Sequence, residues 1–448
     1  MNIEKSETIM PEHSQYSALN NLFEHAMSDP FTSFPISVMV LEKEIRLFLD
    51  GQLKNFNTNV GKSSQKQNFR QRLRALRYRL SHISAPSQSG GLYTALHSFP
   101  MVERVVSDFA TEKGFHLFGA SWKNSKKNYL PVSTLALAGR EFSKINQILL
   151  EQGSLEVFSD QKLMMRLETQ LIKNKRALAS ALRRKNIRGI VVQDDSKPAH
   201  RLLSLAARDA GVPMVVMAHG YIQSPCLHSI APVYADHLVV WSQAQKEKLR
   251  DEAPELRQSD ILKCFGFPYE QSVRDPSPDK ILMLLRPVSL LKEHELQVLV
   301  ERLLRIAHQA QEKGLSLCIK PHPKEASDPI TTKWLVRAGL EIASGRLQEL
   351  LPQTALTLGM DSSGLLESQF MGIPTFHLWQ YKSFEFEDVP VADADDINID
   401  VLIRTHSKSA MLPFGVDAFK DFLAQAIEQK DCSHQYQTEN NSFKRKNH

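Results

Sequence analysis

Residues 187–218 read IRGIVVQDDSKPAHRLLSLAARDAGVPMVVMA and predict a strand–helix–strand unit. A short apolar run at 187–193 is followed by an amphipathic segment of helix length at 199–210 and by a second apolar run at 213–218. Because neither run alternates strictly with polar residues, each is typical of a strand that is buried on both faces. Such strands occur in parallel sheets covered by helices, and this stretch therefore predicts an α/β fold.

The same pattern extends in both directions from this unit. Residues 84–98 are rich in Ser and Gly and predict a turn before a helix, which suits a Rossmann-like lobe. Further strands are predicted at 115–120 and 236–241, and further helices at 101–109, 161–186 and 243–252.

A second array follows a proline-rich linker, DPSP, at 275–278. Its strands are predicted at 280–285, 315–320, 340–343, 354–358 and 374–378, and its helices at 294–313, at 332–338 and from Ser363 onward. Two successive arrays of this kind predict two Rossmann-like lobes that face a cleft. The predicted domains are an N-terminal extension (1–88), an N-terminal acceptor lobe (89–274), a C-terminal nucleotide-donor lobe (275–430) and a disordered polar tail (431–448).

Composition excludes several classes of protein. The chain has 448 residues, of which 42% are hydrophobic and 23% charged, as is ordinary for a soluble globular protein. Its net charge of +5 is too small to indicate nucleic-acid binding. The cysteines are not closely spaced, which argues against a disulfide framework or a zinc motif and favours a reducing cytosol; they are Cys226, Cys264, Cys318 and Cys432.

The N-terminal region predicts a cytoplasmic protein that either is free in solution or rests on the inner face of a membrane. It begins without the apolar core of a signal peptide, and no stretch of the chain reaches the roughly 18 apolar residues that span a bilayer. A basic amphipathic helix is predicted at 62–79, which either lies on anionic lipid headgroups or packs on the domain through its apolar side. Its apolar residues are Phe69, Leu73, Leu76 and Leu80, and its arginines are Arg70, Arg72, Arg74, Arg77 and Arg79.

The motif DSSGLLE, which begins at Asp361, is the strongest candidate for ligand binding. A strand that runs into small hydroxyl residues and then into a helix offers hydrogen-bond donors to a phosphate. Ser362 and Ser363 would donate such bonds, Gly364 would allow close approach, and Glu367 would hold ribose hydroxyls. The alternative is plain capping of the helix by Asp361 or Ser362, with Glu367 in solvent.

The second candidate is KPHPKE, at the end of the strand predicted at 315–320. Two prolines hold His322 in an extended loop, and Lys320 and Lys324 add positive charge on either side. A histidine held in this way can donate a hydrogen bond to a phosphate or protonate it as a leaving group. Arg286, which follows the first strand of the same lobe, would reach a pyrophosphate or else form a surface salt bridge.

The third candidate is AHGY, directly after the strand predicted at 213–218. His219, with Gly220 beside it, would activate an acceptor hydroxyl as a general base or would contact a phosphate. Asp194 and Asp195 end the preceding strand and are alternative bases, unless they only cap the helix that follows. The predicted hinge between the lobes is formed by Gly266 and Pro268 of the sequence GFP.

These motifs resemble those of one group of enzymes. KPHP, and DSSG followed by a glutamate and GIP, resemble the HP and SS motifs of bacterial GT-B enzymes with cytidine-nucleotide donors, namely sialyltransferases, capsule Kdo transferases and teichoic-acid glycerophosphotransferases. AHG and GFP resemble the teichoic-acid group in particular. The resemblance covers residues 187–378. It implies that His322 contacts or protonates the donor phosphate, that Ser362 and Ser363 bind this phosphate, and that His219 lies near the reacting centre.

The chain departs from this group at one motif. Bacterial sialyltransferases carry an acidic motif ending in glycine upstream of HP, whereas residues 291–295 here are LKEHE. The base of the sialyltransferases is therefore not matched, and Asp194, Asp195 and His219 stay as candidates.

The resemblance implies transfer of a sugar from a nucleotide donor to a glycan or lipid-linked acceptor by direct displacement, with no metal and no further cofactor. The expected donor is a CMP-linked acidic sugar and the expected product a surface polysaccharide or lipopolysaccharide. The D-x-D string at 393–395 predicts a solvated loop.

Three alternatives to this function stay open. The first is transfer of a polyol phosphate from a CDP-glycerol-type donor. The second is an enzyme similar to UDP-N-acetylglucosamine 2-epimerases, whose DSGG-x-x-E stretch resembles DSSGLLE, although their GTRPE-like loop is missing here. The third is a non-catalytic homologue that binds glycan.

Overall fold

The computed structural model describes most of the chain between residues 90 and 429. The chain divides into two compact units, here called unit 1 (residues up to 268 and from 414 onward) and unit 2 (269–413). Within the described parts, no helix has the length and apolar character needed to cross a membrane. The described residues are 36, 39, 90–96, 98–119, 160–193, 197–218, 220–222, 233–253, 256, 260–271, 273–286, 293–322, 334–378, 389–405, 409 and 411–429. The basic helix predicted at 62–79 and the tail at 431–448 lie outside them.

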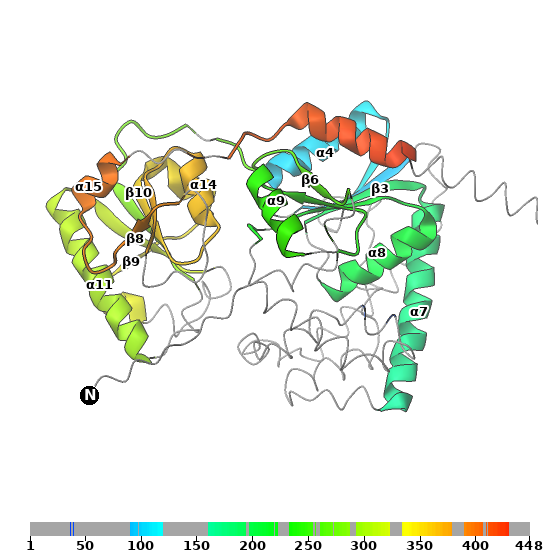
Figure 1. The fold of residues 1–448 in the computed structure, drawn as a ribbon, viewed down its shortest axis with the longest axis horizontal. Helices are drawn as coiled ribbons and strands as arrows, with labels where there is room; N and C mark the ends of the chain where they lie inside the picture. The colour runs from blue at the N-terminus through cyan, green and yellow to red at the C-terminus, as the bar shows by residue number, and fades with distance from the viewer. Residues whose placement is uncertain are drawn as a thin grey trace, which may run out of the picture. The chain divides into compact units, whose positions relative to one another are not determined.

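Unit 1 is built on a six-stranded sheet in which every neighbouring pair is parallel. The strand order is β2-β1-β3-β4-β5-β6. Helix α4 (Pro100–Glu112) and the helix 416–429 lie on one face of the sheet, whereas α7 (Gln161–Arg184) and α8 (Pro198–Ala210) lie on the other (Figure 1). The remaining elements are β1 (Gly91–Ala95), β2 (His116–Gly119), β3 (Ile187–Val192), β4 (Met214–Met217), β5 (His237–Val240), α9 (Gln243–Glu252) and β6 (Leu262–Cys264).

The ends of α8 follow from its sequence. Pro198 starts the helix, because the N–H that proline lacks would have no helical partner in the first turn. Gly211 ends it at φ 71, a left-handed conformation that glycine adopts without a clash of its side chain. On either side β3 and β4 pair in parallel, with Ile190 opposite Met214. The structure therefore confirms the predicted strand–helix–strand unit.

The sequence prediction is wrong about residues 91–95, which form the strand β1 instead of part of a turn. β1 lies between β2 and β3, and all of its residues are buried. Gly91 is required by packing, because a Cβ there would lie 2.6 Å from Cε2 of Phe118 and 2.9 Å from Cδ1 of Ile187. This glycine therefore marks a close approach inside the sheet and not a change of chain direction.

The last described helix, 416–429, belongs to unit 1 by its contacts. Phe422 packs on Phe265 with ring centroids 5.1 Å apart, and Lys420 forms an ion pair with Glu112 at the end of α4. The sequence prediction assigned this segment to the C-terminal lobe because nothing in its local pattern identifies the surface that buries its aromatic side. The predicted boundaries at 274/275 and 430/431 thus differ from the observed division at 268/269 and 413/414.

Unit 2 has a second six-stranded sheet, again with every neighbouring pair parallel. Its order, β9-β8-β7-β10-β11-β12, is the 3-2-1-4-5-6 arrangement of dinucleotide-binding folds. Helices α11 (Glu293–Glu312) and α15 (Ile399–Arg404) cover one face, and α14 (Gly364–Phe370) covers the other (Figure 1). Two Rossmann-like lobes of the α/β class are therefore confirmed. The remaining elements are β7 (Lys280–Leu284), β8 (Ser316–Lys320), β9 (Glu341–Ile342), α13 (Leu347–Leu350), β10 (Thr354–Gly359), β11 (Thr375–Leu378) and β12 (Val391–Ala392).

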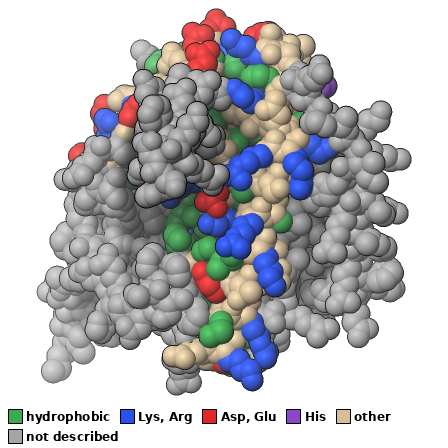
Figure 2. All heavy atoms as spheres, turned by 90° about the vertical axis from the view of Figure 1, so that its right-hand side faces the viewer, with side chains coloured by type: hydrophobic (Ala, Val, Ile, Leu, Met, Phe, Trp, Pro, Cys, Tyr) green, Lys and Arg blue, Asp and Glu red, His purple; other side chains and the backbone are tan. Residues whose placement is uncertain are grey.

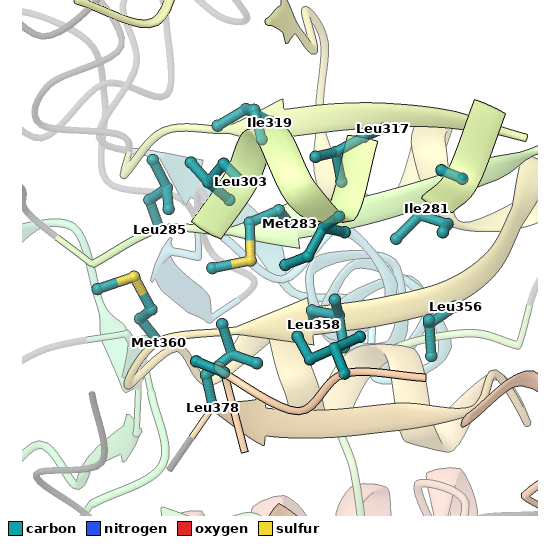
Figure 3. Close-up of a cluster of buried hydrophobic side chains, with 14 of the residues drawn as sticks. Ile281, Met283, Leu285, Leu303, Leu317, Ile319, Leu356, Leu358, Met360 and Leu378 are labelled. Carbon is teal, nitrogen blue, oxygen red and sulfur yellow. The ribbon is translucent and has the colours of Figure 1, made fainter. Parts of the chain in front are cut away.

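Alternate residues of the central strands form the core beneath α11. Side chains at every second position of a strand share one face, and Met283, Ile319 and Leu358 are buried together on this face (Figure 3). From α11, Leu299 and Leu303 pack against them at helical spacing. Because this core is closely packed, the ends of the three strands are held in fixed positions.

Helix α7 presents a basic outer surface. Its leucines face the lobe, whereas Lys and Arg side chains follow its length on the outside (Figure 2). Seven of its residues are basic, and its one acidic residue, Glu168, is buried. The exposed basic residues are Lys162, Arg166, Lys173, Arg176, Arg183 and Arg184.

Candidate functional site

Three neighbouring strands of unit 2 end level with one another. Leu284 of β7 pairs with Lys320 of β8 on one side and with Gly359 of β10 on the other. The pairing continues past the strands, because the N–H of Leu285 donates to the carbonyl of Lys320 at 3.0 Å and the N–H of Met360 donates to the carbonyl of Leu284 at 2.9 Å. The ends of β8, β7 and β10 therefore form one edge, here called the carboxyl edge of unit 2.

Several of the predicted site residues meet at this edge. Arg286, His322 and Asp361 each stand two positions beyond the paired row, and Lys320 belongs to the row itself. The chain leaves β7 toward β8 and later places β10 on the other side of β7, so that the order of connections reverses here. Ligands of open parallel sheets bind outside the carboxyl ends of the strands at such a switch point.

Arg286 forms an ion pair with Asp361. Nη1 of Arg286 lies 3.4 Å from Oδ2 of Asp361, and the two side chains are 22% and 4% exposed. Of the two interpretations open for Arg286, the structure shows a salt bridge, but one that lies at the switch point and is largely shielded from water. Such a pair interacts more strongly than an exposed one.

Asp361 has an unusual backbone. Its φ is 44°, in the left-handed region that non-glycine residues seldom adopt. Its N–H donates to Nε2 of His377 at 3.0 Å, and His377 is buried on β11. A backbone N–H can only donate, so this Nε2 accepts and the ring proton is placed on Nδ1. The same Nε2 lies 3.1 Å from Oδ1 of Asp361, but a nitrogen that accepts has no proton to offer this oxygen.

From the sequence, Asp361 was expected only to cap the helix, and His377 was not among the candidate residues. A signal for His377 was present, since it is a titratable residue inside the apolar strand PTFHL. Its partner could not be found in the same way, because it depends on how β10 and β11 pair.

Ser362 and Ser363 connect β10 to α14. Oγ of Ser362 accepts a hydrogen bond from the N–H of Gly364 at 3.3 Å, whereas Ser363 is the N-cap residue and makes no side-chain capping bond. Capping therefore does not account for the hydroxyl of Ser363. Gly364 is already required by packing, because a Cβ there would lie 2.7 Å from Cδ2 of Leu347 and 2.9 Å from Cδ1 of Leu284.

Glu367 is buried in α14. The capping alternative, which placed this residue in solvent, is therefore wrong on this point. Its Oε2 accepts a hydrogen bond from Nε2 of Gln348 at 2.6 Å, and the hydroxyl of Tyr269 donates to the same carboxyl group. Burial raises the pKa of Glu367 to about 7, although the two hydrogen bonds act in the opposite direction. Burial, together with the charge of Glu367, raises the pKa of Tyr269, so that its hydroxyl keeps its proton.

Lys320 and His322 lie on the β8 side of the edge. Nζ of Lys320 donates to the carbonyl of Gly345 beyond β9. A carbonyl dipole does not cancel the ammonium charge, so Lys320 and Arg286 supply positive charge on adjacent strands. His322 is half-buried and follows the buried Pro321. Lys324 lies outside the described residues.

In unit 1, the loop after β4 is held at both ends by buried polar side chains. Nε1 of Trp241 donates to the carbonyl of Ala218 at 2.8 Å, and Nε2 of Gln245 donates to the carbonyl of Ile222 at 3.3 Å. Trp241 and Gln245 are both buried. The loop that contains Gly220 is therefore fixed at its start and at its end.

The predicted hinge lies just before the division between the units. Gly266 has a φ of 95°, which requires glycine, and Pro268 is buried. The division itself falls after Pro268. The three candidate bases, Asp194, Asp195 and His219, lie outside the described residues.

The acidic string at 393–395 is engaged within unit 2. Oδ1 of Asp395 lies 2.8 Å from Nε of Arg302 on α11, and the Asp395 side chain is 46% exposed. In the part of the chain that the structure describes, no three His, Cys, Asp or Glu residues are grouped as metal ligands.

No protein-family model matches the chain, and no curated protein sequence matches it. Several solved structures are similar to the chain at low identity. The UDP-GlcNAc 2-epimerase from Methanocaldococcus jannaschii is 12% identical over 75% of this chain and 99% of its own, with a TM-score of 0.46. The UDP-GlcNAc 2-epimerase from Neisseria meningitidis, bound to UDP-GlcNAc, is 11% identical over 76% of this chain and 100% of its own, with a TM-score of 0.46. MurG from Acinetobacter baumannii is 11% identical over 75% of this chain and 99% of its own, with a TM-score of 0.37. At these values the similarity concerns the fold and does not assign a function.

Proposed function

We propose that the protein is a glycosyltransferase that binds a nucleotide-activated sugar at the carboxyl edge of unit 2. One observation carries this proposal: β8, β7 and β10 end side by side at the switch point, and the residues at their ends include cationic, imidazole and hydroxyl groups beside the carboxylate of Asp361. These are the donors that bind the oxygens of a phosphate.

Each group has a role in the departure of the nucleotide. Arg286 and Lys320 supply positive charge, and Ser362 and Ser363 donate hydrogen bonds to the phosphate. His322 donates a further bond or a proton as negative charge develops on the leaving oxygen. Glu367 accepts hydrogen bonds from the ribose hydroxyls in its ionised form.

The acceptor hydroxyl needs a general base. A base, either His219 or one of Asp194 and Asp195, takes the proton of the acceptor hydroxyl. The hydroxyl oxygen then attacks the anomeric carbon while the bond from that carbon to the phosphate oxygen breaks. Trp241 and Gln245 would support this step by holding the carbonyls of Ala218 and Ile222 on either side of Gly220.

The donor class rests on the HP and SS motifs of the sequence. Their likeness to enzymes with cytidine-nucleotide donors favours a CMP-linked acidic sugar, with a glycan or lipid-linked acceptor of surface polysaccharide or lipopolysaccharide synthesis. The exposed cations of α7 would bind an anionic membrane surface, where the protein would meet such an acceptor.

Calorimetric titration with CMP, CDP, UDP and GDP tests the proposal on the wild type and on Ser363→Ala. A cytidine nucleotide should bind selectively, and loss of one hydrogen bond to a charged phosphate should weaken it by about 10- to 100-fold. The matched control is Ser180→Ala, on the outer side of α7, which should bind as the wild type does.

Preference for CMP over CDP supports an acidic-sugar donor, and the reverse preference supports polyol phosphate transfer. Selective binding of UDP shifts the assignment to an epimerase-like or UDP-sugar enzyme. Absence of binding to every nucleotide refutes the enzymatic proposal and favours a glycan-binding homologue.

A further inference from the structure

Asp361 places a negative charge where the proposed donor phosphate binds. Its carboxylate is 4% exposed and faces the guanidinium of Arg286 across 3.4 Å. Phosphate oxygens and this carboxylate therefore compete for the same cation, and they repel each other at short range. A site that only had to bind phosphate tightly would not contain this acid.

The position of the acid is built into the fold. Asp361 has a left-handed φ of 44°, which residues other than glycine seldom adopt. His377, from the next strand, accepts the N–H of Asp361 and so holds this conformation from within the sheet. The strained backbone and its buried partner together fix the direction of the carboxylate.

We infer that Asp361 is an internal counter-charge. It forms an ion pair with Arg286 when no donor is bound, and the donor phosphate displaces it from Arg286. The inference rests on the proposed function and extends it to the selection between donor and product. The donor phosphate is a diester with one negative charge, whereas the released nucleoside monophosphate carries about −1.5 to −2 at pH 7. Asp361 opposes the product more strongly than the donor and thereby promotes its release.

The test is the replacement Asp361→Asn, which keeps the shape of the side chain and the tolerance for positive φ but removes the charge. Binding of cytidine, CMP and inorganic pyrophosphate is measured by calorimetry at one ionic strength. CMP and pyrophosphate should bind on the order of tenfold more tightly to the variant, as expected when one nearby charge of like sign is removed. Uncharged cytidine should bind with unchanged affinity, because only a phosphate competes with Asp361.

Two further variants separate the charge from the fold. Arg286→Gln is measured alone and together with Asp361→Asn. The gain from Asp361→Asn should be smaller in the Arg286→Gln background, because the phosphate and the carboxylate then have no shared cation to compete for. His377→Leu removes the acceptor of the Asp361 N–H, whereas His377→Gln retains an acceptor in its place. We expect the CMP affinity of His377→Leu to differ from that of the wild type. His377→Gln should bind CMP as the wild type does.

Equal or weaker binding of CMP and pyrophosphate by a folded Asp361→Asn variant overturns the inference, as does an equal gain for cytidine. Failure of the proposed function gives a different pattern. In that case the wild type binds no nucleotide, whereas the effect of Asp361→Asn on pyrophosphate still decides the role of the counter-charge.

Discussion

Glu367 is a buried acid whose ionisation the fold opposes. Burial raises its pKa from 4.5 to about 7, so the folded protein binds this proton more tightly than the unfolded chain does between these two values. The contribution of the neutral form to stability is complete below pH 4.5 and is lost as pH rises through 7. The size of the shift corresponds to about 3 kcal/mol, to order of magnitude.

Replacement of Glu367 by Gln should remove this pH dependence. Between pH 5 and pH 8 the wild type should lose free energy of unfolding relative to Glu367→Gln, by up to about 3 kcal/mol, in denaturant titrations. Ligand binding should show the opposite trend, because only the carboxylate can accept both ribose hydroxyl protons. A nucleoside without phosphate should therefore bind the wild type more tightly at pH 8 than at pH 6.

The nucleoside is the appropriate ligand because it lacks the phosphate, which itself titrates in the same pH range. Asp395, an exposed acid of the same unit, supplies the matched control as Asp395→Asn. Parallel pH profiles of wild type and Glu367→Gln, in both stability and binding, would contradict a raised pKa at this residue.

Among the elements, the loop after β4 shows how buried polar groups can position a candidate functional segment. Trp241 fills the space between Phe99 and Phe267 with its ring, at centroid distances of 6.4 and 5.1 Å. At the same time its indole N–H fixes the carbonyl of Ala218. One side chain therefore joins the core of unit 1 to the start of the loop.

Trp241→Phe should separate these two contributions. An aromatic ring is kept, but the carbonyl of Ala218 loses its donor, and leaving a buried acceptor unsatisfied costs about 1–3 kcal/mol. We expect a lower free energy of unfolding in urea and a lower turnover number, with little change in nucleotide affinity because the proposed nucleotide site lies in unit 2. Phe99→Leu, which alters the same core without touching the loop carbonyl, is the control. A loss of stability without loss of turnover would show that the loop does not depend on Trp241.

The elements that local pattern could predict are those with a complete apolar run. β3, β4, β7 and β10 were predicted because their residues are buried on both faces and flanked by helices of clear period. β1 was missed because the pair Gly90-Gly91 at its start resembles a turn, although Gly91 packs closely against Phe118.

The candidate site could be predicted in part for the same reason. Motifs at strand ends identified Arg286, His322 and the two serines, since parallel strands bring their carboxyl ends to one edge. The pairing of Arg286 with Asp361 joins residues 75 positions apart and depends on β7 lying beside β10. The burial of Glu367 likewise depends on Gln348 and Tyr269, which come from distant segments.

At the scale of the whole molecule, charge is divided unevenly between the units. Unit 1 contains 40 Lys and Arg against 30 Asp and Glu, a net charge of +10, whereas unit 2 contains 15 against 20, a net charge of −5. The overall value of +5 therefore conceals a basic unit 1. Within it, α7 carries exposed cations along a helix of 24 residues, about 36 Å in length.

We predict that α7 binds an anionic membrane surface. The apolar side of α7 is buried in unit 1, so the helix has charge but no apolar face to insert, and its binding should be purely electrostatic. Each Lys or Arg near an anionic leaflet contributes about 1 kcal/mol. Reversal of two of them in Lys173→Glu/Arg176→Glu should weaken binding to vesicles with anionic lipid by at least roughly 30-fold in flotation assays.

The control carries the same change of net charge in unit 2, as Arg337→Glu/Arg404→Glu, at two exposed positions. It should float with anionic vesicles as the wild type does, and none of the three proteins should bind zwitterionic vesicles. Binding of the wild type should also fall with added salt, because surface charges are screened within about 10 Å at 0.1 M. If the α7 variant floats as well as the wild type, the contact with the membrane lies elsewhere, and the basic segment at 62–79 becomes the segment to test.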